Sequence, residues 1–191
     1  MNKLITAIAI ACALVLGGAQ AQTPTYAIDP THTFVNFEVL HLGLSSSRGR
    51  VGKLAGNIEF DRSARRGRLD ITVDVNNLDT GLAMLDKELR GKDFFDTEQF
   101  PSARFVADKF VFNGDRVSEI EGSFTLRGVS LPLTLKASRF NCYPHPFLKR
   151  EACGGDFEAT LQRSKWGMVK YAPDIVADNV RLLIQVEAIR Q

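Results

Sequence analysis

The chain has 191 residues, with 24 lysines and arginines against 22 aspartates and glutamates, a formal net charge of +2. This near-neutral balance lacks the basic excess that a nucleic-acid partner demands, so the charge argues against nucleic-acid binding. The length fits one domain with a single hydrophobic core.

The first 21 residues have the pattern of a secretory signal peptide. Lys3 precedes an apolar run from Leu4 to Leu16, and Ala19-Gln20-Ala21 follows it. That order predicts cleavage after Ala21 and export to the periplasm. The apolar run is shorter than the roughly 20 residues that a membrane-spanning helix needs. We therefore expect a signal peptide at 1–21 and one exported domain at 22–191, to which the loss of Lys3 leaves a net charge of +1.

The exported domain alternates between apolar and polar residues along most of its length. In the first such run, Val35, Phe37 and Val39 alternate with Asn36 and Glu38. A period of two over a short run predicts a half-buried antiparallel strand. Comparable runs predict eight strands, at 33–39, 54–60, 69–75, 102–112, 120–126, 131–137, 156–163 and 180–188. Short polar links between them are typical of hairpins, so the pattern favours a barrel or a sandwich.

One segment departs from this alternation. Between residues 81 and 90 the apolar positions Leu82, Leu85 and Leu89 are three and four residues apart. This spacing predicts a short amphipathic helix. The aromatic pair Phe94-Phe95 follows it.

Two cysteines remain in the exported domain. They are Cys142 and Cys153, and the periplasm permits disulfides. An even number of cysteines in such a compartment predicts a structural disulfide, which here would close a short loop. A redox-active pair is disfavoured, because the spacing is not Cys-x-x-Cys.

Residue patterns for catalysis are scarce. His32, His41 and His145 are the only histidines, and they lack metal-ligand spacing. Asp86 and Glu88 are two residues apart on the predicted helix and cannot face each other as an acid and base pair. No phosphate-binding loop or G-x-S-x-G motif is present. We therefore predict neither a metal site nor catalytic residues.

A set of short strings occurs in order along the domain. They are Tyr26-Ala-Ile-Asp29, His41-Leu-Gly43, Gly56-Asn-Ile-Glu-Phe-Asp61, Leu78-Asp-Thr80, Leu85-Asp-Lys-Glu-Leu-Arg90, Asp93-Phe-Phe-Asp96 and Gly122-Ser-Phe-Thr-Leu-Arg-Gly-Val129. In this combination the chain resembles the YceI family of secreted bacterial lipid-binding proteins, from Tyr26 to the last strand. The resemblance implies an all-β fold, an eight-stranded antiparallel lipocalin-like barrel with a helix beside it. It also implies a long polyisoprenoid or related amphiphile in an apolar tunnel, no other cofactor, and a homodimer.

An eight-stranded barrel is either filled by its own side chains or holds one slender ligand. Residues expected to line the tunnel are Phe37, Val39, Phe60, Phe105, Phe124, Leu135, Phe157, Trp166, Leu182 and Ile184. Candidates for binding a polar head group at the mouth are His41, Arg48, Arg50 and Arg90, because arginine can fork onto phosphate or a quinone oxygen. The alternatives are plain core packing for the first set and solubilising surface charge for the second.

We therefore expect a periplasmic carrier for an isoprenoid lipid, such as a polyprenyl or quinone-like amphiphile, with transient contact to a membrane or membrane protein. Two alternatives stay open. One is an isomerase or cyclase acting on a bound lipid, although the predicted inward positions include no obvious acid or base. The other is a solid barrel that binds proteins through the helix and Phe94-Phe95.

Overall fold

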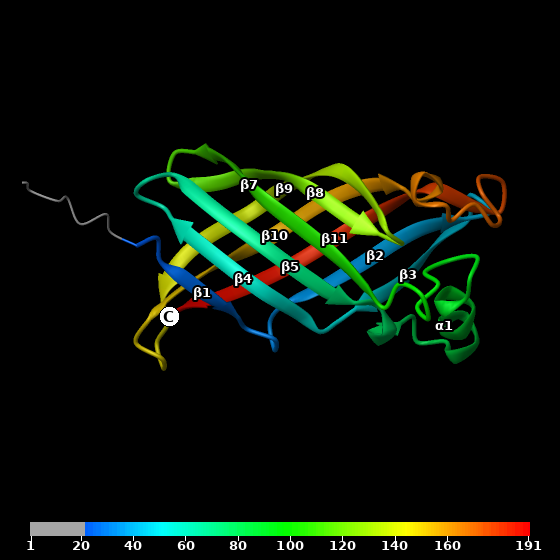
Figure 1. Ribbon diagram of the computed structural model, residues 1–191, viewed down its shortest axis with the longest axis horizontal. Helices are drawn as coiled ribbons and strands as arrows, with labels where there is room; N and C mark the ends of the chain where they lie inside the picture. Colours follow the sequence, from blue (N-terminus) through cyan, green and yellow to red (C-terminus); the bar gives the residue numbers. More distant parts are fainter. Residues whose placement is uncertain (1–21) are drawn as a thin grey trace, which may run out of the picture.

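The computed structural model describes residues 22–191, so the predicted signal peptide at 1–21 lies outside the described residues. The described residues form a closed antiparallel β-barrel with a short helix near one end (Figure 1). In chain order the elements are β1 (Thr25–Ile28), β2 (Phe34–His41), β3 (Ser45–Val51), β4 (Leu54–Asp61), β5 (Arg66–Asp74), the 3-10 helix η1 (Val75–Asn77), β6 (Leu78–Asp79), α1 (Ala83–Arg90), β7 (Ser102–Asn113), β8 (Arg116–Leu126), β9 (Val129–Pro144), β10 (Glu151–Gln162), the 3-10 helix η2 (Arg163–Trp166) and β11 (Val176–Arg190). Within these residues no helix is both long and apolar enough to cross a membrane.

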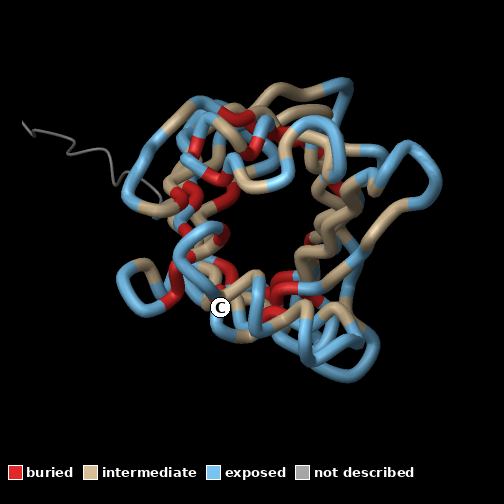
Figure 2. The backbone as a smooth tube through the Cα atoms, turned by 90° about the vertical axis from the view of Figure 1, so that its right-hand side faces the viewer, coloured by how far each residue is buried: buried red, intermediate tan, exposed pale blue. Residues whose placement is uncertain are grey.

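The strand segments amount to eight strands around the barrel. β1 and β2 act as one bent strand, and β3 and β4 act as its neighbour, because β2 pairs with β3 and β1 pairs with β4. The chain then continues as an antiparallel meander from β5 through β7, β8, β9 and β10 to β11. β11 closes the ring by pairing with both β1 and β2. Figure 2 looks along the barrel and shows this closed ring. The prediction of an eight-stranded antiparallel barrel is confirmed.

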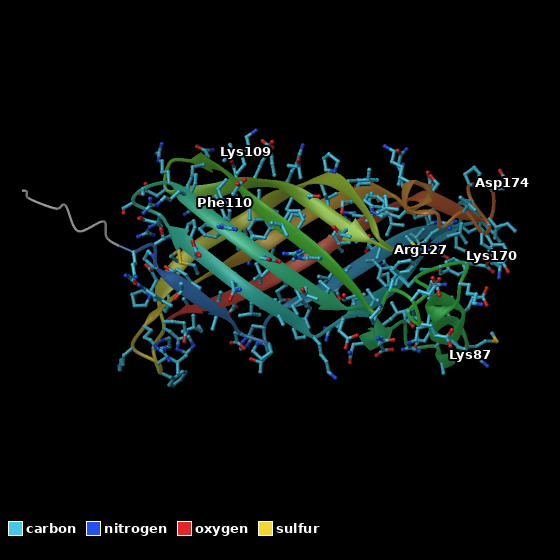
Figure 3. All side chains as sticks on the ribbon, viewed as in Figure 1. Lys87, Lys109, Phe110, Arg127, Lys170 and Asp174 are labelled. Atoms are coloured by element: carbon cyan, nitrogen blue, oxygen red, sulfur yellow. A yellow bond between two sulfur atoms is a disulfide. The ribbon has the colours of Figure 1, made fainter. Side chains whose placement is uncertain are left out.

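Alternation along each strand separates an apolar interior from a charged exterior. On β7, Lys109 points outward and forms an ion pair of 2.6 Å with Glu121, whereas Phe110 faces the interior (Figure 3). On β11, Leu182 faces the interior while Arg181 reaches the exposed carboxylate of Glu158. The charges predicted on the outer face therefore solubilise the barrel and leave its interior apolar.

β3 is a strand that alternation did not predict. Its first residues are Ser45, Ser46 and Ser47, which give no apolar period, yet β3 pairs with β2 residue by residue from Ser45 to Val51. Gly49 on β3 lies directly under the ring of Phe37, and a Cβ atom there would collide with that ring. The glycine therefore makes room for an aromatic side chain on the inner face.

The predicted helix is present as α1, within the expected range of 81–90. Asp86 accepts hydrogen bonds from the backbone N–H and the hydroxyl of Thr80, at 2.8 and 2.6 Å. The bond from the Thr80 hydroxyl lowers the pKa of Asp86. Arg90 donates to the carbonyl oxygens of Asn76 and Leu78 at 3.2 and 2.6 Å. These bonds fix both ends of the helix to the segment that precedes it.

The two ends of the barrel differ, and Figure 1 shows both. We call the end with α1 and the β10–β11 connection (residues 163–175) the helix end. We call the other the disulfide end, because Cys142 and Cys153 are register partners on β9 and β10 there and form the predicted bond. Both ends of the described chain meet here too, where the backbone N–H of Gln191 donates to the Thr25 carbonyl at 2.9 Å.

Candidate ligand-binding cavity

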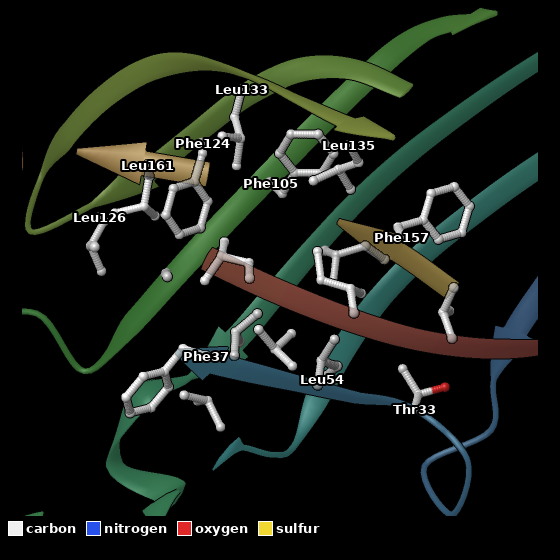
Figure 4. Close-up of a pocket in the computed structure, with 18 of the residues that line it drawn as sticks. Thr33, Phe37, Leu54, Phe105, Phe124, Leu126, Leu133, Leu135, Phe157 and Leu161 are labelled. Carbon is white, nitrogen blue, oxygen red and sulfur yellow. The ribbon is translucent and has the colours of Figure 1, made fainter. Parts of the chain in front are cut away.

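The barrel encloses a cavity of about 260 Å³. Its wall consists almost entirely of apolar side chains from the long strands, and Figure 4 shows several of them converging on the same space from opposite walls. Thr33 is an exception on the wall, but its hydroxyl is occupied because it donates to the Glu187 carbonyl at 3.1 Å. The interior is therefore a hollow apolar space rather than a solid core.

An aromatic cluster closes the cavity at the disulfide end. The ring of Phe60 lies at its centre, with centroid distances of 6.2 Å to Tyr26, 6.1 Å to Phe110, 6.2 Å to Phe112 and 5.6 Å to Phe140. Such separations are those of favourable aromatic pairs.

The phenol of Tyr26 adds a partly buried hydrogen bond to this cluster. It donates to a carboxylate oxygen of Glu151 at 2.6 Å. Burial, followed by this bond, raises the pKa of Tyr26, so the phenol stays neutral.

Two segments cover the helix end, and we call them together the cover: residues 83–97, which comprise α1 and the loop after it, and residues 163–175. Leu89, Phe94 and Phe95 of the first segment and Met168 of the second line the cavity. Phe94 is only 7% exposed. It therefore faces the interior instead of offering the exposed docking patch considered from the sequence.

Polar contacts hold the two segments of the cover together. The ammonium of Lys170 pairs with Glu88 at 2.6 Å and with Asp93 at 3.0 Å, and the hydrogen bond to Glu88 raises its pKa. The guanidinium of Arg127, in the β8–β9 turn, donates to the carbonyls of Gly167 and Lys92 at 2.9 and 3.0 Å. Figure 3 places Lys170 and Arg127 at this end.

Arg163 is the one charged side chain on the cavity wall within residues 22–191. It is 4% exposed. Its guanidinium donates to the carbonyl oxygens of Met168 at 2.7 Å, Val176 at 2.9 Å and Ala177 at 3.1 Å. Burial lowers the pKa of Arg163, but a guanidinium remains charged at neutral pH. Arg163 was not predicted as a cavity residue from the sequence, although it follows the inward series Phe157, Ala159, Leu161 as the first residue of η2.

The structure places nine of the ten predicted tunnel residues on the cavity wall. They are Phe37, Val39, Phe60, Phe105, Phe124, Leu135, Phe157, Leu182 and Ile184. Trp166 is the exception: it is buried behind the wall, with its ring 5.9 Å from that of Phe124 and its indole N–H donating to the Val129 carbonyl at 3.0 Å. Contact of these nine residues with a ligand stays a prediction.

None of the four predicted mouth residues lies on the cavity wall. Arg48 pairs with Glu38 at 2.7 Å on the outer face, and Arg50 lies over the Phe34 ring, 4.1 Å from its centroid. Both point outward because they alternate with the inward positions of β3. Arg90 is occupied by backbone carbonyls, as described above. Val39 is the last residue of β2 on the cavity wall. His41 follows two residues later on the same face of the strand, beyond the wall.

Two groups of potential metal ligands occur in the described part of the chain. In the first, Cys142 and Cys153 accompany Glu151, but the two sulfur atoms are bonded to each other. The second is a surface group of Asp29, His32 and Glu187. Asp29 is already held by His32 at 2.8 Å and by the Thr31 hydroxyl at 2.6 Å. Neither arrangement indicates a metal centre.

Exposed apolar side chains gather around the helix end. We call them the apolar collar: Leu40, Leu42, Leu44, Leu82, Met84, Val169, Tyr171 and Ile175. Leu44 is 83% exposed and Met84 is 77% exposed. The collar lies on the end of β2, the β2–β3 turn, the start of α1 and the segment 163–175, which flank this end of the cavity. A grouped set of exposed apolar residues is typical of an interaction site rather than of ordinary surface.

Comparison with known sequences identifies relatives along the whole chain. A family model described as the YceI-like domain matches residues 26–188. A UPF0312 protein of Pseudomonas aeruginosa (strain LESB58) is 34% identical over 194 residues, covering all of both chains. A UPF0312 protein of Vibrio parahaemolyticus is 37% identical over 135 residues, which are 69% of this chain and 70% of that protein.

Solved structures share the fold at low sequence identity. BcnA of Burkholderia cenocepacia superposes with a TM-score of 0.67 at 20% identity, covering 84% of this chain and 98% of that one. The Campylobacter jejuni YceI protein gives 0.65 at 22%, covering 80% and 90%. A domain from Saccharophagus degradans described as polyisoprenoid-binding gives 0.62 at 14%, covering 87% and 98%.

Proposed function

The chain belongs to the family of YceI-like domains, and on this premise we propose that it binds and carries a long isoprenoid lipid, a polyprenyl or quinone-like amphiphile, in its barrel. The cavity is the observation that carries the proposal. An apolar cavity of roughly 150 Å³ already accepts a molecule the size of benzene. The cavity here is larger, at about 260 Å³, and extends from the aromatic cluster to the cover.

The energetics of such binding need no special chemistry. Moving a hydrocarbon tail out of water yields about 0.8 kcal/mol per CH₂ group. Ten such groups give roughly 8 kcal/mol before the costs of ordering the ligand are subtracted. A dry apolar wall is therefore sufficient for tight binding.

The ligand class is supported by the neighbouring structures. The Saccharophagus degradans domain, which shares this fold, is described as binding polyisoprenoids. A wall that combines phenylalanine rings with leucine, isoleucine and valine suits a methyl-branched chain.

We assign binding rather than catalysis to the cavity. The polar side chains on its wall, Thr33, Tyr26 and Arg163, are each hydrogen-bonded to the protein. Proton transfer on a bound lipid needs a group whose pKa is close to neutrality. The raised pKa of Tyr26 moves its phenol away from that range.

We further propose that the protein works in the periplasm after loss of residues 1–21. The order of Lys3, the apolar run and Ala19-Gln20-Ala21 supports this location. Cell fractionation followed by N-terminal sequencing tests it, with Gln22 expected as the first residue. Full-length protein in the cytoplasm would contradict it. The homodimer implied by the family resemblance is tested on the same purified protein by sedimentation velocity.

Lipid extraction and mass spectrometry of protein purified from its native host test the function. We expect a co-purified prenyl lipid at a stoichiometry near one per cavity. The variant Leu182→Trp fills the interior from β11, whereas Leu183→Trp places the same ring on the outer face of the same strand and is the matched control. We expect the lipid to be lost from the first variant and kept in the second. An empty cavity in the wild-type protein, or equal lipid in both variants, would contradict the proposal.

A further inference from the structure

The hydroxyl groups on the cavity wall are bonded within the protein. The phenol of Tyr26 uses its hydrogen in the bond to Glu151, at 2.6 Å. The hydroxyl of Thr33 donates to the backbone carbonyl of Glu187 and accepts from the backbone N–H of the same residue, both at 3.1 Å. Neither hydroxyl therefore has a hydrogen left to donate to a ligand.

Arg163 is the charged residue on this wall, and its charge is compensated where it lies. Each of its three guanidinium nitrogens donates to a backbone carbonyl oxygen, those of Ala177, Met168 and Val176, at 2.7 to 3.1 Å. The carboxylate of Asp178 also acts favourably on the charge. The guanidinium is therefore directed at the backbone and offers no free fork to a ligand in the cavity.

The rest of the wall supplies no hydrogen-bond donor either. Its other side chains are apolar, and the backbone N–H groups of the strands bond to neighbouring strands within the sheet. Among residues 22–191, no buried side-chain nitrogen or oxygen atom lacks a hydrogen-bond partner. A charged group that entered this space would lose its hydration without gaining a partner, and that loss is severe for an ion. A hydrocarbon group has no such hydration to lose.

Both ends of the cavity are closed over this apolar space. The aromatic cluster around Phe60 lies at the disulfide end, and Leu89, Phe94 and Met168 of the cover lie at the helix end. While the cover stays in place, the head group of an enclosed ligand does not reach water. The apolar wall therefore selects the head group of an enclosed ligand as well as its tail.

We propose that the cavity selects its ligand against charge: it encloses an uncharged isoprenoid, such as a prenol or a quinone, and rejects the same tail when it carries an anionic head group. This inference rests on the proposed function and narrows its ligand class to neutral lipids. The hydroxyl or carbonyl groups of these lipids lose far less hydration than a phosphate or a carboxylate does.

The test uses a ligand whose charge is switched by pH. Farnesoic acid is an isoprenoid with a terminal carboxyl group, which ionises at roughly pH 4–5 as carboxyl groups do in water. Methyl farnesoate has the same tail and no charge at any pH. Isothermal titration calorimetry on delipidated protein gives the Kd of both probes at pH 5 and pH 8. We expect the acid to bind at least about tenfold more weakly at pH 8 than at pH 5, and the ester to bind equally at both.

The ionisable groups of the wall keep their charge over this range. Burial raises the pKa of Tyr26, so its phenol stays neutral, and the guanidinium of Arg163 stays charged. Glu151 lies behind Tyr26 and accepts its hydrogen. Histidine titrates in this range, and His41 lies on β2 beyond the wall. The variant His41→Gln should keep the pH dependence of the acid, because the carboxyl group of the probe causes it.

A cation placed on the wall should reverse the selection. Leu182→Lys adds an ammonium to the inner face of β11, whereas Leu183→Lys adds it to the outer face of the same strand and is the matched control. At pH 8 we expect the first variant to bind the acid at least as tightly as the ester, since the carboxylate gains a partner. The second should reject the acid as the wild type does.

The wild-type comparison stands even if Leu182→Lys fails to fold. Equal affinity for the acid and the ester at pH 8 in the wild-type protein would overturn selection against charge and leave the lipid carrier intact. A folded Leu182→Lys variant that still rejects the acid would overturn the explanation that the wall lacks a free partner. If neither probe binds at either pH, the carrier proposal fails as well.

Discussion

The ring of Phe110 occupies the space that a side chain at position 67 would need. A Cβ atom on Gly67 would lie 2.7 Å from Cζ of Phe110 and 2.8 Å from both Cε atoms. Gly67 is the register partner of Phe60, the central ring of the aromatic cluster. The glycine on β5 therefore allows the two rings to pack side by side at the disulfide end.

Replacing this glycine should disturb the aromatic cluster. We expect Gly67→Val to destabilise the protein by about 1–3 kcal/mol, because forcing a side chain into a packed site displaces its neighbours. Urea denaturation measures the change. In a double-mutant cycle, Gly67→Val should cost less in the Phe110→Ala background than in the wild type, because the ring that it collides with is gone. An equal cost in both backgrounds would contradict this explanation.

The disulfide should contribute measurably to stability. Cys142 and Cys153 close a short loop, with a sequence separation of 11 residues. Loop-closure entropy predicts a loss of about 3 kcal/mol for Cys142→Ala combined with Cys153→Ala. Chemical denaturation of oxidised and reduced protein measures it. A reducing agent should leave the stability of the double alanine variant unchanged. If it destabilised that variant as much as the wild type, the loss would have a cause other than the disulfide.

Lys170 should control the local stability of the cover. Lys170→Gln removes the ion pairs to Glu88 and Asp93, so amide hydrogen exchange should become a few-fold faster in residues 92–97 and 168–176. The strands should keep their protection. Lys109→Gln removes the comparable pair with Glu121 on the outer wall and is the control. Unchanged exchange in the cover would show that the pairs do not hold it.

The surface pair Asp29–His32 should give a specific pH dependence. Its hydrogen bond lowers the pKa of Asp29 from 3.8 to about 2 and raises the pKa of His32 above 6.5. The His32 contribution is fully present below pH 6.5 and is lost as the pH rises through its raised pKa. The Asp29 contribution is present above pH 3.8 and is lost as the pH falls through about 2.

The variant His32→Ala checks this pair. We expect it to be less stable than the wild type between about pH 4 and 6.5 and equally stable at pH 9, where the wild-type pair has lost its proton. Urea denaturation at pH 5.5 and 9 measures both states. A stability difference that persists unchanged at pH 9 would contradict the assignment.

The apolar collar should speed the exchange of lipid with a membrane. Replacing Leu44 and Met84 together by serine should slow lipid transfer from vesicles by about tenfold, because less apolar surface can enter the bilayer. Equilibrium affinity should be unchanged, since neither residue lines the cavity. Leu148→Ser, exposed at the disulfide end, is the control. If Leu148→Ser slowed lipid transfer equally, the apolar collar would not be the surface that exchanges lipid with the membrane.

The fold was predictable from the sequence where side chains alternate. The apolar period revealed most of the barrel strands, but β3 escaped because its serines carry no period while its backbone still pairs with β2. Alternation also could not decide between a barrel and a sandwich. That choice depends on the pairing of β11 with β1 and β2, a long-range contact that only the family resemblance implied.

The residues of the cavity wall were predictable for the same reason, and the prediction was wrong where the alternation ends. Nine inward positions of strands lie on the wall, but Trp166 belongs to η2, whose 3-10 turn leaves the strand pattern. Arg48 and Arg50 were selected by residue type, whereas their register on β3 turns them outward. Arg163 was overlooked because its type suggested surface charge, although it comes two residues after Leu161 in the inward series and is the first residue of η2.

The seam between the first and last strands has a consequence for biosynthesis. Tyr26 pairs with Arg190, and Gln185 pairs with Phe34, so the ring joins residues from opposite ends of the chain. A chain that folds from its N-terminus can form its hairpins in turn, but it presents two unpaired edges until the final strand joins the ring. Truncation within the last fifteen residues should therefore yield an aggregation-prone open sheet rather than a slightly weakened barrel.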